Sequence, residues 1–172
     1  MASLIENLVS VLEQENSEYE ILLELSRKKT PVIVKGDIVR LQEITDEEQN
    51  IIDRIYHLEK KREEHIHDIA DVINRDVGQL KLENLIQMLD KSPREQRMLA
   101  EVHDKLHVTI SQMQSINAQN RELLTGALEM VEFDLNLFQS MRRAPETANY
   151  NKGAYNAGNI MGVDAGRFDA KQ

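Results

Sequence analysis

The residues best spaced to share one chemical task are His103 and His107, which lie four positions apart. On an α-helix this spacing places two imidazoles one turn apart on the same face, an arrangement that zinc sites use. The residues between them lack the glutamate of a zinc-protease motif, and the sequence offers no evident third ligand. We therefore expect solvated or seam-flanking histidines and no metal site.

Other catalytic chemistry finds little support. The chain has no cysteine, which excludes a disulfide framework, a thiolate zinc site and a thiol nucleophile. Gly158, Gly162 and Gly166 recur every four residues, but no strand precedes them, so they do not form a phosphate cradle. No serine stands in a nucleophile motif. The sequence therefore predicts a protein that is not an enzyme, with no catalytic residue and no cofactor.

The overall charge narrows the choice of partners. The net charge is −9 and 30% of the residues are charged. An acidic surface repels phosphate backbones, so we expect no nucleic-acid partner. No apolar run approaches the ~18–20 residues of a membrane span, and the first residues do not resemble a secretory signal. The lack of cysteine fits a reducing compartment, and we expect a cytoplasmic protein.

Hydrophobic periodicity predicts three long helices. The first covers about residues 2–34, and Pro31 either ends it near Lys29 or kinks a helix that continues to Lys35. A tight corner is expected at Gly36 and Asp37, because glycine suits the end of a helix and aspartate caps the next one. The second helix covers about 38–74, and a short apolar piece follows at 80–89.

The third helix has the clearest start, because Ser92, Pro93 and Glu95 form a capping box with the favoured proline. Apolar positions in the second and third helices then step by three or four residues, the coiled-coil period. The second seam consists of Leu41, Ile44, Glu48, Ile51, Ile55, Leu58, Arg62, Ile66, Ile69 and Ile73. The third consists of Leu99, Val102, Leu106, Thr109, Met113, Ile116, Asn120, Leu123, Ala127, Met130, Asp134, Leu137 and Met141.

The predicted fold is all-α, an elongated antiparallel three-helix bundle or coiled coil over residues 1–144. A helix of roughly 50 residues spans about 75 Å, whereas a compact chain of this length is only about 40 Å across. Residues 145–172 are rich in glycine and asparagine, carry no net charge and show no periodicity. We expect this tail to be disordered, or to become ordered on a partner or over the third helix.

A second apolar stripe appears beside the first after Asn120. It consists of Leu124, Leu128, Val131, Leu135 and Phe138. The resulting arc is about twice as wide as a two-stranded seam needs, and something must cover it. The cover is either the core of the bundle itself, an apolar partner helix, or a second copy of the chain. Asn120 lies on the seam, where it either fixes the register as a buried residue or borders solvent.

Three short segments carry a family resemblance. They are Lys35–Leu41 before a Glu/Gln-rich helix, Asn120–Leu124 at the start of the doubled stripe, and Gly166–Lys171 near the end. Together with the acidic helical pattern they resemble FlgN-type flagellar export chaperones. The resemblance implies a cytoplasmic chaperone of the flagellar type III export system, which binds hook-associated (hook–filament junction) proteins and prevents their premature assembly. The export apparatus is a possible further partner.

The resemblance places the partner-binding residues in the stretch from Asn120 to Phe138. They would be Leu123, Leu124, Ala127, Leu128, Val131, Leu135 and Phe138. A different reading of the same pattern is a structural spacer or tether, a homo-oligomeric coiled coil in which the spare stripe is buried between copies. The sequence leaves both functions open.

Overall fold

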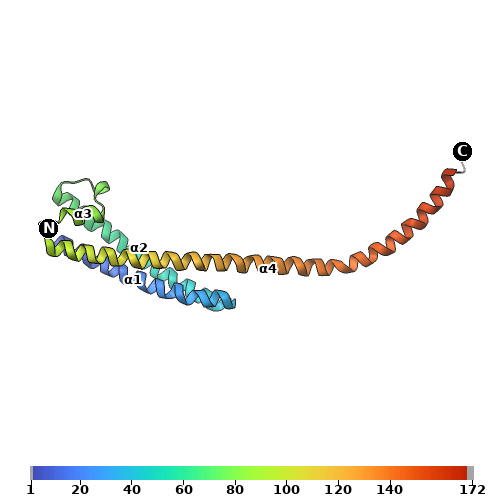
Figure 1. Cartoon of the computed structure of the whole chain (residues 1–172), viewed down its shortest axis with the longest axis horizontal. Coiled ribbons are helices and arrows are strands. Elements are labelled where there is room, and N and C mark those ends of the chain that lie inside the picture. Colours follow the sequence, from blue (N-terminus) through green and yellow to red (C-terminus); the bar gives the residue numbers. More distant parts are fainter. Residues whose placement is uncertain (1, 170–172) are drawn as a thin grey trace. The chain divides into compact units, whose positions relative to one another are not determined.

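The computed structural model describes the backbone of residues 2–169 and the side chains of residues 2–142 except residue 79. The elements in chain order are helix α1 (Ala2–Lys35), helix α2 (Ile38–Ile73), the 3₁₀ turn η1 (Val77–Gln79), helix α3 (Leu82–Met88) and helix α4 (Pro93–Asp169) (Figure 1). The described residues contain no strand. The predicted all-α fold is confirmed. The chain divides into two units between Thr125 and Gly126, and each is described by itself.

The corner between α1 and α2 forms where the sequence predicted it. Gly36 has a φ of +68°, a left-handed conformation that only glycine adopts without steric penalty. The Asp37 carboxylate then caps α2 by accepting a hydrogen bond of 3.0 Å from the amide of Arg40. Helix α1 does not end near Lys29: it continues through Pro31 to Lys35, since the missing N–H removes one bond from an otherwise well-packed helix.

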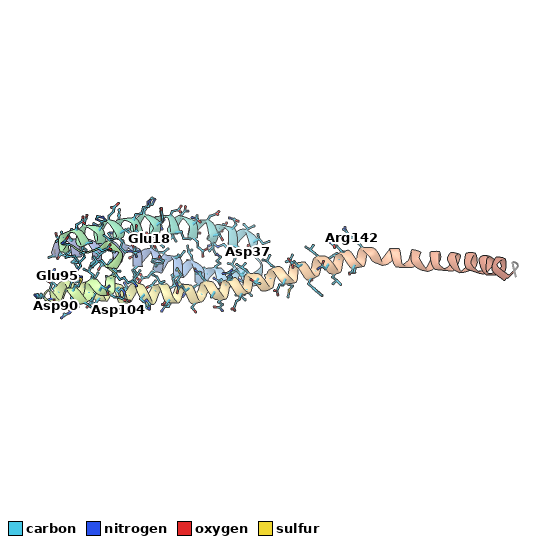
Figure 2. The ribbon with its side chains drawn as sticks, turned by 90° about the horizontal axis from the view of Figure 1, so that it is seen from above. Glu18, Asp37, Asp90, Glu95, Asp104 and Arg142 are labelled. Carbon is cyan, nitrogen blue, oxygen red and sulfur yellow. The ribbon has the colours of Figure 1, made fainter. Side chains whose placement is uncertain are left out.

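Contacts between α1 and its neighbours define the topology of residues 2–125. Glu15 pairs with Arg62, and Lys29 pairs with Glu48, so α2 runs antiparallel to α1. Thr109 bonds to Asn16 and Asn120 bonds to Ser26, so α4 runs parallel to α1. Figure 2 shows Asp37 at the tip of the α1–α2 hairpin and Glu95 at the opposite end, where α4 begins. The predicted antiparallel three-helix bundle is therefore confirmed within residues 2–125.

The first core lies at the end of this unit that holds α3. It is built from α1, α2, α3 and α4, and Leu8, Leu12, Ile69 and Leu99 are fully buried. Leu80, Leu85 and Leu89 from the short connecting segment close this end. Four elements thus share one apolar cluster, which fixes the start of α4 against the hairpin.

The second core lies toward the hairpin tip and is made mainly by α1 and α2. Its buried members are Leu22, Leu25, Ile44, Ile51 and Ile55. Helix α4 contributes only the partly buried Met113 to this cluster among the described residues. The hairpin therefore has an apolar core of its own, on which α4 lies.

Both predicted seams are confirmed within this unit. All ten seam positions of α2 are buried or half-buried, and so are the seam positions of α4 from Leu99 to Leu123. The two polar members of the α2 seam each find a partner on α1: Glu48 pairs with Lys29 at 2.7 Å and Arg62 pairs with Glu15 at 2.8 Å. Asn120 is also buried, at 3% exposure, so it is a seam residue and does not border solvent.

The end of α4 differs from the sequence-based boundary. The sequence predicted a helix that stops before Pro145, whereas the backbone is helical to Asp169. The side chains of residues 143–172 lie outside the described residues, and these include the apolar positions of the predicted tail and the Gly166–Lys171 motif. The division into a bundle of residues 1–144 and a disordered tail of residues 145–172 stays a prediction.

Candidate partner-binding surface

Helix α4 carries a set of exposed apolar side chains after Gly126, with Asp134 between them on the first stripe. We call this set the apolar surface of α4. It consists of Ala127, Leu128, Met130, Val131, Leu135, Leu137, Phe138 and Met141. Its large members are between 49% and 68% exposed, far more than the seam residues of the bundle. Such a concentration of exposed apolar area typically marks a contact surface.

Helical geometry explains why these side chains share one side of α4. Residues three and four apart are neighbours on a helix. The stripe of Leu128, Val131, Leu135 and Phe138 therefore lies beside that of Ala127, Met130, Leu137 and Met141. Glu129 and Glu132 fall on the opposite side, so this part of α4 is amphipathic.

The seven sequence-predicted site residues divide into two groups. Ala127, Leu128, Val131, Leu135 and Phe138 are exposed, whereas Leu123 and Leu124 are half-buried and belong to the preceding unit. Of the three covers that the sequence left open, the core of the bundle itself does not bury the exposed five among the described residues. Their role in binding a partner stays a prediction.

One exposed aromatic residue beside this surface was not among the predicted site residues. Phe133 is 66% exposed, and it is three residues after Met130 and four before Leu137, so it borders the first stripe on the helix. The available signal was this spacing to Met130 and Leu137. Its ring extends the apolar area around the helix.

The electrostatics of this stretch are one-sided. No lysine or arginine occurs from residue 122 to residue 141, whereas Glu122, Glu129, Glu132 and Asp134 all do. Arg142 is the first cation after the apolar surface and is exposed (Figure 2). The apolar surface therefore lies in a locally negative potential.

The histidine pair does not form a site. His103 is half-buried with Nδ1 3.2 Å from an Asp104 carboxylate oxygen, and His107 is exposed. Within the described part of the chain, no group of three or more histidine, aspartate or glutamate side chains is arranged to hold a metal ion. In the same residues, no helix combines the length and the hydropathy that crossing a membrane requires.

A comparison with protein families identifies the chain. The family model described as FlgN protein matches residues 1–157. The match includes α1, α2, α3 and the apolar surface of α4. No curated protein and no solved structure matches the chain significantly. Since the matched region covers the whole three-helix bundle, the chain belongs to the FlgN family, a family of flagellar export chaperones and not of enzymes.

Proposed function

We propose that this chain is a cytoplasmic export chaperone that binds the apolar terminal helices of flagellar hook–filament junction proteins. In this role it shields those helices from premature assembly and passes the bound protein to the type III export apparatus. The observation that carries the proposal is the apolar surface of α4, whose large side chains are at least 49% exposed.

The proposed mechanism is the packing of one helix on another. A client helix that will later pack in a polymer has an uncovered apolar stripe while it is a monomer. The two stripes on α4 supply a complementary surface, read at the i, i+3, i+4 and i+7 spacing of helix-in-groove recognition. Covering the client stripe prevents it from pairing with another client.

The size of the surface is sufficient for binding. Each large aliphatic side chain that becomes fully buried contributes about 1.5–3 kcal/mol before ordering costs. Leu128, Val131, Leu135 and Phe138 are roughly half to two-thirds exposed in the free chain, so each still has most of this contribution to gain. Four or five such residues, less the cost of ordering both helices, are enough for about micromolar affinity without any nucleotide.

The charges around the surface favour a particular kind of client. Four carboxylates and no cation surround the apolar side chains between residues 122 and 141. A client helix with lysine or arginine beside its apolar stripe would therefore associate faster than an acidic one, and added salt would reduce this advantage.

The experiment compares two folded variants of the full chain. In the first, Leu128→Glu and Val131→Glu place charges in the apolar surface. In the control, Val72→Glu on α2 and Val108→Glu on the bundle part of α4 change side chains of similar exposure, 59% and 54%. The binding of purified hook–filament junction proteins is measured by calorimetry. Loss of binding in the first variant alone supports the proposal, and equal binding by both variants contradicts it.

The alternative role as a homo-oligomeric spacer uses the same exposed surface. Light scattering over a concentration series separates the two functions. A spacer requires assembly in the absence of any client, and the Leu128→Glu, Val131→Glu variant would then be a monomer. A wild-type chain that stays monomeric and binds its client excludes the spacer.

A further inference from the structure

A polar contact joins α4 to α1 near the end of the bundle unit. Asn120 donates a hydrogen bond of 2.8 Å from Nδ2 to the carbonyl oxygen of Ser26. The Thr30 hydroxyl donates to Oδ1 of Asn120 at 2.6 Å. We call Ser26, Thr30 and Asn120 the Asn120 node. It is the last buried contact before the apolar surface of α4 begins.

The burial of the α4 seam decreases toward this node. Near its start, α4 places Leu99, Val102 and Leu106 in the first core. Further along, two hydrogen-bonded contacts join α4 to α1, the Thr109–Asn16 bond and the Asn120 node. Met113 and Ile116, the apolar seam residues between them, are only half-buried. The hairpin keeps the second core without α4, so separation here leaves that core largely intact.

The node is also incompletely satisfied. The Ser26 hydroxyl oxygen is buried without a hydrogen-bond partner among the described residues. Pro31 has no N–H, so the carbonyl of Arg27 loses its partner in the next turn of α1. A buried polar group without a partner stabilises a closed state less than an apolar contact would. Water can satisfy all of these groups once the helices separate.

The seam that α1 covers is the same seam that continues into the apolar surface. Met113, Ile116, Asn120 and Leu123 precede Ala127 and Met130 in one unbroken register of three- and four-residue steps. A client helix on the apolar surface would therefore lie on the same seam of α4 as these residues. If the node opens, Met113, Ile116 and Leu123 become available to that client.

We propose that the Asn120 node is a latch: it opens to release residues 113–124 of α4 from α1, and a bound client helix then extends onto Met113, Ile116 and Leu123. The client half of this inference rests on the proposed function. Opening itself is a property of the free chain, so it is measured without a client.

The first experiment measures amide hydrogen exchange along α4 in the free full-length chain. If the latch opens, the amides of residues 113–124 should exchange at least about tenfold faster than those of residues 99–110, because the two stretches then open separately. Equal protection of the two stretches would overturn the latch, whatever the client results are.

The second experiment locks the node. The chain has no cysteine, so Thr30→Cys with Asn120→Cys introduces a single possible disulfide between side chains that touch. The oxidised variant should slow exchange at residues 113–124 and bind a purified hook–filament junction protein about tenfold more weakly than the same variant after reduction. Equal binding by the two forms would show that the client does not use the released seam.

A second variant tests the latch without a disulfide, because a disulfide could itself distort the bundle. Thr30→Val with Asn120→Leu replaces the polar contact by an apolar one, and we expect slower exchange and weaker client binding than wild type. Asn120→Ala removes the latch, and we expect faster exchange. If both variants exchange like wild type, the node does not control opening. The proposed function is tested separately by the Leu128→Glu, Val131→Glu variant. If this variant loses all client binding while its amide exchange stays like that of wild type, the latch is unaffected.

Discussion

The Glu15 carboxylate on α1 accepts a hydrogen bond of 2.8 Å from Nη1 of Arg62 on α2 through one oxygen, while its other oxygen is buried without a partner among the described residues. The Glu15 side chain is fully buried, whereas that of Arg62 is 26% exposed. Burial raises the pKa of Glu15 from 4.5 to about 7, and the charge of Glu59 adds to the rise although Arg62 opposes it.

This pKa predicts how stability depends on pH. Between pH 4.5 and about 7 the folded chain holds a proton on Glu15 that the unfolded chain has released. The contribution of Glu15 to stability is therefore full below pH 4.5 and is lost as the pH rises through 7, by at most about 1.4 kcal/mol per pH unit. Glu15→Gln stays neutral at every pH. The free energy of unfolding of this variant minus that of wild type should rise between pH 5 and pH 8 in urea titrations.

The matched control for this pH effect is Glu18→Gln, which changes a more exposed carboxylate on the same helix that pairs with Arg54. The rise measured for Glu15→Gln should exceed any change measured for this variant over the same pH range. A flat difference for Glu15→Gln would mean that Glu15 titrates normally in the folded chain.

Truncation in the first core should be costly. Leu12 is fully buried within the cluster that joins α1, α2, α3 and α4, so we expect Leu12→Ala to lower the free energy of unfolding by about 2–5 kcal/mol. Leu128→Ala removes the same atoms from an exposed position and should change it by less than about 0.5 kcal/mol. Chemical denaturation followed by circular dichroism measures both, and similar losses would contradict the assigned burial.

Two ion pairs that involve α1 should differ in how much they stabilise the folded chain. Lys29 and Glu48 pair between helices at 2.7 Å with side chains 19% and 12% exposed, whereas Arg27 and Glu24 pair within α1 at 49% and 60% exposure. Lys29→Ala leaves a largely buried carboxylate without its cation, and we expect a loss of about 1–3 kcal/mol. Arg27→Ala should lose under about 0.5 kcal/mol. Thermal denaturation at low and moderate salt compares the two, and the reverse order would refute this ranking.

The hairpin corner offers a glycine test. Gly36 has a φ of +68°, and the space that a Cβ would occupy there is open, so Gly36→Ala should destabilise through the backbone alone, by about 1 kcal/mol. Gly126 lies inside α4 with equally open space and no positive φ. There alanine should instead favour the helix by about 0.5–1 kcal/mol. Opposite signs in urea titrations are the expected result.

The sequence was most informative where local rules decide the structure. Gly36 and Asp37 marked the corner because turn and cap chemistry involve only neighbouring residues. The seams of α2 and α4 followed from periodicity, since burial of one helix face requires that pattern whichever helix covers it. The same rule predicted the stripes around Leu128 and Val131, because a helix face is set by spacing alone.

Contacts between distant residues were not predictable in this way. Nothing in the α2 seam shows that Glu48 will meet Lys29, because the partner depends on how two helices are aligned. For the same reason the sequence did not show whether Asn120 is buried or borders solvent. In the structure it is buried and donates a hydrogen bond to the carbonyl oxygen of Ser26. Where burial stops along α4 also depends on contacts between distant residues, so spacing alone did not show that Leu124 is half-buried and Leu128 exposed.

The tight corner at Gly36 also determines how long the α1–α2 hairpin is. Within residues 2–125 the hairpin covers α4 along α1, which ends at Lys35, so the position of Gly36 sets the length of the covering hairpin. Adding seven residues to both α1 and α2 would lengthen the hairpin by about two helical turns. The length of the α4 seam that the hairpin protects would then be set by α1 and α2, and not by the sequence of α4.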